Sequence, residues 1–226
     1  MRVLAIDTAL EACSAAIFDT GQAAILASES QIMVRGHAEA LMPLIGAVMA
    51  QAALDFDAID RVAVTVGPGS FTGLRVGIAA SRGIALAAGK PIVGLTTFAA
   101  LATPYIVADE TQPVAAMIDA RHDHVYFQLF GAGGQTLIAP RVMPVRDAAH
   151  AAASASALLV GSGAGLALRA WPDNEAQPHV DPRRAADIDW VARLGAAADI
   201  QQSAPKPFYL RAPDAKPQAV AGLPRR

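Results

Sequence analysis

The order of apolar and polar positions along the chain predicts alternating strands and helices. Apolar runs of strand length, bounded by turn residues, lie at 3–6, 12–18, 23–27, 62–66 and 92–95 in the first half, and at 158–160 in the second. Apolar residues recur with helical spacing at 37–53, 74–88 and 188–198. This alternation is typical of an α/β fold.

The second half repeats the beginning of the first. Residues 3–21 align with residues 115–133, so that Ile6-Asp7 falls on Ile118-Asp119 and Gly21 falls on Gly133. Both copies consist of a strand, an aspartate, a turn and a second strand. We therefore expect a duplication in which two similar lobes, 1–103 and 104–204, face each other across a cleft, followed by a tail, 205–226.

The composition indicates a globular chain. Hydrophobic residues make up 54% of 226 residues, charged residues 17%, and the mean hydropathy is +0.35, which excludes disordered, collagen-like and disulfide-rich classes. The uncharged stretch 91–108 reaches the length of a membrane span, but Gly94 and Pro104 interrupt it. Cys13 is the single cysteine, and we expect a small core residue in a reducing compartment. The expectation is a cytoplasmic protein without a membrane segment.

The charge is small but unevenly distributed. The net charge of −2 excludes a global attraction to nucleic acid. From Gln201 onward, however, one acid, Asp214, accompanies five basic residues: Lys206, Arg211, Lys216, Arg225 and Arg226. This tail is interpreted as a solvated segment, with a basic strap on a phosphate backbone or an acidic partner as the alternative.

The segment 67–73 (Gly-Pro-Gly-Ser-Phe-Thr-Gly) joins a predicted strand to a predicted helix. Such a loop can present backbone N–H groups to an anion. It is not a P-loop, because the lysine of that motif is missing, and Pro68 removes one N–H of a dinucleotide loop. The alternative is a tight turn that lets a helix of small residues pack closely. Both interpretations remain open.

Two aspartates, Asp7 and Asp119, end the first strand of each lobe. They could point into the cleft and hold a metal–phosphate complex, or they could cap the turns that follow. For Asp7 neither interpretation is favoured over the other, whereas for Asp119 the capping role is favoured. His122 and His124 lie near a hairpin tip without an evident third metal ligand, so a solvated turn is expected there.

The two helices of the first lobe carry more apolar surface than one small lobe needs. Met42 and Met49 form a second apolar edge on helix 37–53, and helix 74–88 is apolar almost all round except for Arg75 and Arg82. A helix that is apolar on every side must be buried on every side. We therefore expect a partner protein to cover part of these helices.

These residues also carry a family resemblance. Ala5-Ile6-Asp7-Thr8, His37-Ala38-Glu39, the segment 67–75 with Gly77, Gly94-Leu95 and Tyr209-Leu210-Arg211 closely resemble the bacterial TsaB family. The resemblance implies duplicated lobes of the actin, Hsp70 and sugar kinase type (ASKHA). It also implies an accessory, non-catalytic subunit of the machinery that makes threonylcarbamoyladenosine next to the anticodon of tRNA.

The resemblance implies several partners. The catalytic subunit would be a TsaD-type paralogue bound through the first-lobe helices, with a TsaE-type ATPase joining the complex, tRNA contacted indirectly, and a homodimer in isolation. The paralogue's His-x-x-x-His metal pair falls on Thr97 and Leu101, which would hold a metal poorly. No cofactor or metal of its own is implied, and ATP or ADP shared at the joint interface is left open. A small-molecule kinase or ATPase, or a peptidase-like relative, is the alternative.

The helix pattern and the resemblance together predict a partner-binding surface without catalytic residues. A charged residue at Ile78 or Ala80 is expected to abolish the complex and leave the monomer folded. The predicted partner-binding residues are His37, Leu41, Met42, Ile45, Met49, Arg75, Ile78, Ala79 and Arg82.

Overall fold

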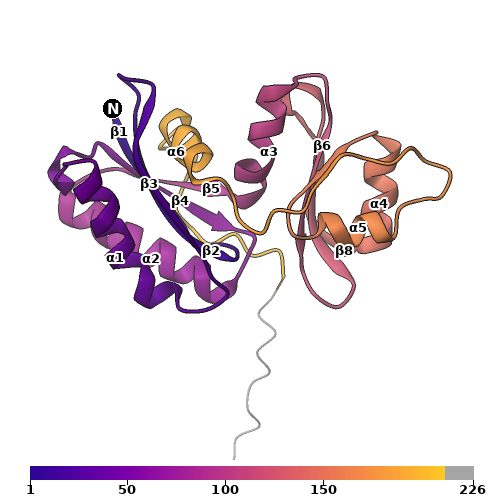
Figure 1. Ribbon diagram of the computed structural model, residues 1–226, viewed down its shortest axis with the longest axis horizontal. Helices are drawn as coiled ribbons and strands as arrows, with labels where there is room; N and C mark the ends of the chain where they lie inside the picture. Colours follow the sequence, from indigo (N-terminus) through magenta and orange to yellow (C-terminus); the bar gives the residue numbers. More distant parts are fainter. Residues whose placement is uncertain (212–226) are drawn as a thin grey trace, which may run out of the picture.

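The computed structural model describes residues 1–211, which form two five-stranded sheets side by side (Figure 1). The first sheet has the order β3-β2-β1-β4-β5, and the second has the order β8-β7-β6-β9-β10. The strands of the first are β1 (Arg2–Asp7), β2 (Ala12–Asp19), β3 (Ala24–Ile32), β4 (Arg61–Gly67) and β5 (Ile92–Thr96). Those of the second are β6 (Val114–Asp119), β7 (His124–Phe130), β8 (Thr136–Pro144), β9 (Leu158–Val160) and β10 (Val180–Asp181).

The two sheets confirm the duplication. In each, the first strand pairs antiparallel with the second and parallel with the fourth, and the second pairs antiparallel with the third. Asp7 and Asp119 stand at the same place, at the end of the central strand of each sheet. The predicted α/β fold of two similar lobes is therefore confirmed.

Helices cover both sheets. Helices α1 (His37–Gln51) and α2 (Phe71–Ala88) pack on the first sheet, and α3 (Thr97–Ala108) lies between the sheets in contact with β4, β5 and β6. Helices α4 (Val145–Ser154) and α5 (Ala164–Arg169) pack on the second sheet. Short 3-10 turns lie at Phe56–Ala58 and Ala132–Gly134.

The helix α2 begins three residues earlier than the periodicity predicts. The Ser70 hydroxyl accepts a hydrogen bond from the Gly73 N–H at 3.2 Å and so caps its first turn. Gly89 ends the helix in the left-handed conformation, with φ of 64°. The glycine-rich loop therefore leads directly into α2, and Phe71 and Gly73 belong to the helix.

The last helix, α6 (Ile188–Ala197), packs against β1, β2 and β4 of the first sheet. The Arg61 guanidinium donates to three carbonyl oxygens at its C-terminal end, those of Gly195, Ala196 and Ala198, at 2.8, 3.0 and 2.9 Å. The chain thus returns to the first lobe within the range 104–204 that the sequence assigned to the second. Figure 1 shows α6 above the first sheet, far along the chain from β1.

The residues after α6 continue along the first lobe as a strap, defined here as residues 203–211. The Gly94 N–H donates to the Ser203 carbonyl at 2.8 Å, and the Phe208 N–H donates to the Val66 carbonyl at 2.7 Å. The predicted tail is therefore packed over its first part, 205–211. Its other basic residues, Lys216, Arg225 and Arg226, lie outside the described residues.

The main core runs from the first lobe through α3 into the second sheet, where Val114, Ile118 and Phe130 belong to it. A smaller core lies between the second sheet and helices α4 and α5. Cys13 is buried in the main core, as predicted. No helix within residues 1–211 is long and apolar enough to span a bilayer.

Candidate functional site

The glycine-rich loop packs against the turn that follows β1. A Cβ atom on Gly69 would lie 2.2 Å from the Ala9 carbonyl oxygen, and one on Gly73 would lie 2.1 Å from that of Thr8. The Ser70 N–H donates to the Ala9 carbonyl at 2.7 Å, and the Thr8 hydroxyl donates to the Gly73 carbonyl at 2.7 Å. Close packing therefore accounts for these glycines, and the Ser70 N–H is already used within the chain.

Asp7 is fully buried and caps the same turn. Its Oδ1 accepts from the Ala9 N–H at 3.0 Å and from the Thr65 hydroxyl at 2.5 Å. Burial raises the pKa of this carboxyl, while the Thr65 and Ala9 hydrogen bonds partly oppose the rise. Of the two readings open for Asp7, the structure supports the cap, and Asp7 does not line the cleft between the lobes.

Asp119 lies at the cleft and also caps its turn. Its Oδ1 accepts from the Arg121 N–H at 2.8 Å, and its Oδ2 lies 3.7 Å from the Arg121 guanidinium. The cap favoured for Asp119 is confirmed. The next residues form a tight hairpin, in which His124 Nδ1 lies 2.7 Å from the His122 carbonyl oxygen. Groups of three metal-ligating side chains are not found within residues 1–211.

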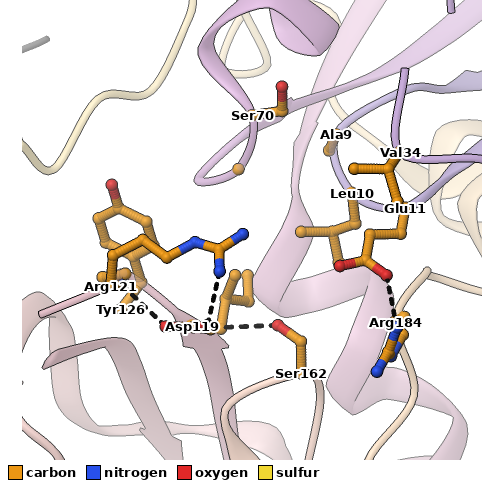
Figure 2. Close-up of a pocket in the computed structure, with 13 residues that line it drawn as sticks. Ala9, Leu10, Glu11, Val34, Ser70, Asp119, Arg121, Tyr126, Ser162 and Arg184 are labelled. Atoms are coloured by element: carbon orange, nitrogen blue, oxygen red, sulfur yellow. Dashed lines mark hydrogen bonds and ion pairs between the residues drawn. The ribbon is translucent and has the colours of Figure 1, made fainter. Parts of the chain in front are cut away.

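The cleft between the lobes has a volume of about 580 Å³. Figure 2 shows Asp119, Arg121, Tyr126 and Ser162 on one side and Ser70 and Glu11 on the other. Its charged groups are paired within the chain, because Arg184 lies 3.0 Å from the Glu11 carboxylate and Arg121 lies beside Asp119. The cleft thus contains two cations and two anions. Each cation already has a counter-ion within the chain, so neither is free to pair with a phosphate group.

A second hollow lies between α1, the turn at Phe56–Ala58 and α2, with a volume of about 420 Å³. We call it the helix groove. Apart from Asp57, its lining is apolar or glycine: Met42, Phe56, Ala80, Gly83, Ile84, Ala87 and Ala88. Met42 in its lining is 51% exposed, and Leu86, on the exposed side of α2, is 85% exposed. Large apolar side chains so exposed at a groove are typical of an interaction surface.

The structure divides the predicted partner-binding residues into two groups. The exposed ones are Met42, Arg75, Ala79 and Arg82. The buried ones, which pack inside the first lobe, are His37, Leu41, Ile45, Met49 and Ile78. The buried and the exposed side chains recur at helical spacing and therefore face opposite sides of each helix. The buried ones pack in the core of the first lobe.

The burial corrects one expectation. Ile78 is 3% exposed, so a charge there would disturb the fold of the lobe as well as any interface. His37 is buried, and its Nε2 lies 3.1 Å from the Leu10 carbonyl oxygen, a contact that ties α1 to the turn after β1. The helix α2 is also not buried on every side, since Ala79, Arg82, Gly83 and Leu86 are exposed.

Sequence reasoning missed two parts of this surface. Phe56 belongs to a 3-10 turn that the periodicity does not reveal, yet it lines the helix groove. Tyr209 of the strap stacks on Phe71 with ring centroids 5.2 Å apart, and its hydroxyl accepts from Arg75 Nε at 3.2 Å. The Tyr209-Leu210-Arg211 run is visible in the sequence, but its place beside α2 depends on the tertiary fold.

Comparisons with known proteins extend this description. The sequence model of the family described as "TsaD: tRNA N6-adenosine threonylcarbamoyltransferase" matches residues 25–170. The tRNA threonylcarbamoyladenosine biosynthesis protein TsaB of Escherichia coli is 31% identical over 182 residues, 76% of this chain and 74% of that protein. An uncharacterised protein of Mycobacterium tuberculosis is 36% identical over 222 residues, 96% of this chain and 95% of that protein.

A solved structure is also similar. YeaZ from Pseudomonas aeruginosa superimposes with a TM-score of 0.77 at 28% sequence identity, and the match covers 92% of this chain and 99% of that one. The likeness extends over both lobes, because a match of this coverage leaves neither sheet outside it.

Proposed function

The chain belongs to the TsaB family, and we propose that it is the non-catalytic scaffold subunit of the complex that adds threonylcarbamoyl to the tRNA adenosine next to the anticodon. Its relatives place it in the biosynthesis of threonylcarbamoyladenosine in tRNA. Its role there is to bind and support the catalytic TsaD-type paralogue. The observation that carries this proposal is the exposed apolar face formed by α2 and the helix groove.

The energetics of this face favour a protein partner. Full burial of one leucine-sized side chain contributes about 2 kcal/mol, and Leu86 is 85% exposed and Met42 51% exposed. Ala79 and Gly83 are small exposed residues of the same helix and allow another helix to approach closely. A paralogue built on the same duplicated lobes would present the counterparts of α1 and α2 to this face.

The cleft supports a non-catalytic role. Its cations are paired with Asp119 and Glu11, and the Asp7 carboxyl is buried beneath the turn. The positions that correspond to the paralogue's metal pair, Thr97 and Leu101, are both buried on α3. In this proposal the chemistry belongs to the partner. A shared nucleotide would bind at the interface of the two subunits, and the TsaE-type ATPase would contact this chain within the complex. The complex would act in the cytoplasm.

Co-purification with the catalytic paralogue tests the proposal. We expect the two chains to elute together, and Leu86→Glu to weaken the complex by roughly a hundredfold, because it places a charge in an apolar contact. Leu137→Glu is the matched control, since Leu137 is an exposed leucine on β8 of the second lobe. Equal elution of both variants with the partner would contradict this surface.

A modification assay tests the role itself. The paralogue alone should modify tRNA poorly, and addition of this chain should restore the reaction, whereas the Leu86→Glu variant should fail to restore it in proportion to its lost affinity. Modification by this chain without the paralogue would overturn the non-catalytic assignment. Isolated chains are expected to associate weakly as homodimers through the same face.

A further inference from the structure

The charges on α2 are all of one sign. Its eighteen residues contain Arg75 and Arg82 and no acidic residue. The two arginines are seven residues apart, so they stand two helical turns apart on one side of α2, about 10 Å along its axis. Ala79 and Leu86 are exposed next to them, while the helix groove lies along the opposite edge of the exposed face.

The strap holds both side chains. Arg82 donates to the Pro205 carbonyl oxygen at 2.6 Å, and Arg75 Nε donates to the Tyr209 hydroxyl at 3.2 Å. The Arg75 guanidinium also lies 3.8 Å from the centre of the Phe71 ring, on which Tyr209 stacks. These contacts fix the direction of two long side chains that would otherwise lose rotamer entropy on binding.

The partners of both arginines in the strap are neutral. Within residues 1–211 neither guanidinium has a carboxylate within ion-pair distance, in contrast to Arg184 and Arg121 at the cleft. Asp57 in the helix groove and Glu39 in the first turn of α1 belong to other elements, and neither forms an ion pair with these arginines. The charge on this edge of α2 is therefore uncompensated within the described chain.

We propose that Arg75 and Arg82 form a preoriented pair of cations that binds carboxylates of the catalytic partner. This inference rests on the proposed function and adds the chemistry that selects the partner. A helix of the partner that runs alongside α2 would carry two carboxylates about 10 Å apart, the spacing of residues i and i+7. The apolar face supplies affinity, and the charge pair supplies selectivity.

The same charges act against self-association. In a two-fold dimer the same patch meets itself, so α2 against α2 brings the arginines of one copy near those of the other. Like charges at such a contact repel, and salt screens the repulsion. Salt therefore has opposite effects on the two complexes: it weakens the complex with the partner and strengthens the homodimer.

Affinity measurements at two salt concentrations test this inference. Between about 50 and about 500 mM NaCl we expect the dissociation constant with the paralogue to rise about tenfold, and self-association in the ultracentrifuge to become stronger. The variant Arg75→Gln/Arg82→Gln should bind the paralogue about tenfold more weakly at low salt and lose both salt dependences. Arg146→Gln on α4 is the control for removal of an exposed charge and should match the wild type.

A double-mutant cycle tests the positioning role of the strap. Tyr209→Phe keeps the ring on Phe71 and removes the acceptor of Arg75, so we expect a two- to threefold loss of affinity, by roughly the strength of one exposed hydrogen bond. The same substitution should cost nothing in the Arg75→Gln background. An equal loss in both backgrounds would overturn the positioning role.

The outcomes separate the two proposals. If the wild type fails to bind the paralogue at either salt concentration, the proposed function fails and this inference fails with it. If the wild type binds but the arginine variants bind equally well and with the same salt dependence, the inference fails while the proposed function stands.

Discussion

The backbone of Gly73 touches the Thr8 carbonyl so closely that a Cβ atom on Gly73 would lie 2.1 Å from its oxygen. The Thr8 hydroxyl in turn donates to the Gly73 carbonyl at 2.7 Å. This contact joins the end of β1 to the first turn of α2. It places the glycine-rich loop against the chain's own backbone, so that α2 is held at a fixed position on the first sheet.

Gly73→Ala should destabilise the protein by about 3 kcal/mol. The new methyl group meets the Thr8 backbone, which cannot move aside as a flexible side chain would, and overpacking of this kind shifts the whole helix. Urea unfolding followed by circular dichroism would measure the loss. A free energy of unfolding within about 0.5 kcal/mol of the wild type would show that the contact is not as tight as described.

Gly46→Ala is the matched control for this substitution. Gly46 lies inside α1, and a Cβ atom there would have no atom within 4 Å. Alanine is the better helix former, so the free energy of unfolding should rise by up to about 1 kcal/mol. The two substitutions are chemically identical, and their opposite signs would isolate the effect of the Thr8 contact.

Much of the fold could be predicted because its signals are local. The strand 12–18 and helix 37–53 are strongly patterned, and the match of residues 3–21 to 115–133 predicts the second sheet. The place of α6 could not be predicted, since an apolar helix face does not specify which of two sheets it covers. What decides it is Arg61 at its C-terminal end and Gly195 against Ala63, and these contacts join residues far apart in sequence.

The candidate surface was predicted at the level of helices but not of side chains. The periodicity of 74–88 shows an apolar helix, yet it cannot tell which side the sheet covers, so Ile78 and Ala79 appear equivalent until β4 is in place. Asp7 was ambiguous for the same reason. A strand-end aspartate points to the cleft or into the turn depending on the loop that packs over it, here 67–73.

Asp7→Asn should become more stable relative to the wild type as the pH rises. Burial raises the folded-state pKa of Asp7, so its contribution to stability is complete below the unfolded pKa and is lost as the pH rises through the folded value. Asparagine cannot ionise, so the variant does not lose stability as the pH rises. Its unpaired side-chain N–H groups lower the stability of the variant by an amount that does not depend on pH. Free energies of unfolding from pH 3 to pH 8 would give the difference, and a difference independent of pH would contradict it.

Asp109→Asn supplies a control of opposite sign. Hydrogen bonds from the Thr111 hydroxyl and N–H lower the pKa of Asp109. Its contribution to stability is therefore present above the unfolded pKa and is lost as the pH falls through the folded one. The substitution should lower stability at neutral pH, and the loss should vanish in acid. A general effect of removing a carboxylate would have the same sign in both variants. Opposite pH dependences would therefore show that the pKa values of Asp7 and Asp109 are shifted in opposite directions.

Gly94→Ala should release the strap. A Cβ atom on Gly94 would lie 2.6 Å from Val66 Cγ1, 2.8 Å from the Ala204 carbonyl oxygen and 3.0 Å from Pro205 Cα. The two contacts with the backbone of the strap would push it from β5. Trypsin can then reach the bond after Arg211, whereas Lys206 precedes Pro207 and is not cut, and the cleavage rate should rise at least about tenfold as the local opening free energy falls. Gly165→Ala, where a Cβ atom would meet nothing within 4 Å, is the control and should be cut at the wild-type rate.

The isolated protein should bind Mg-ATP with a dissociation constant weaker than about 1 mM. The phosphates of a nucleotide in the cleft would need cations and free N–H groups, but Arg121 and Arg184 are paired with Asp119 and Glu11, and the Ser70 N–H donates to Ala9. Calorimetry gives the affinity. If this pairing is the reason, the Glu11→Gln/Asp119→Asn variant, which frees both arginines, should bind ATP more tightly than the wild type. Micromolar binding by the wild type would instead favour the kinase or ATPase alternative.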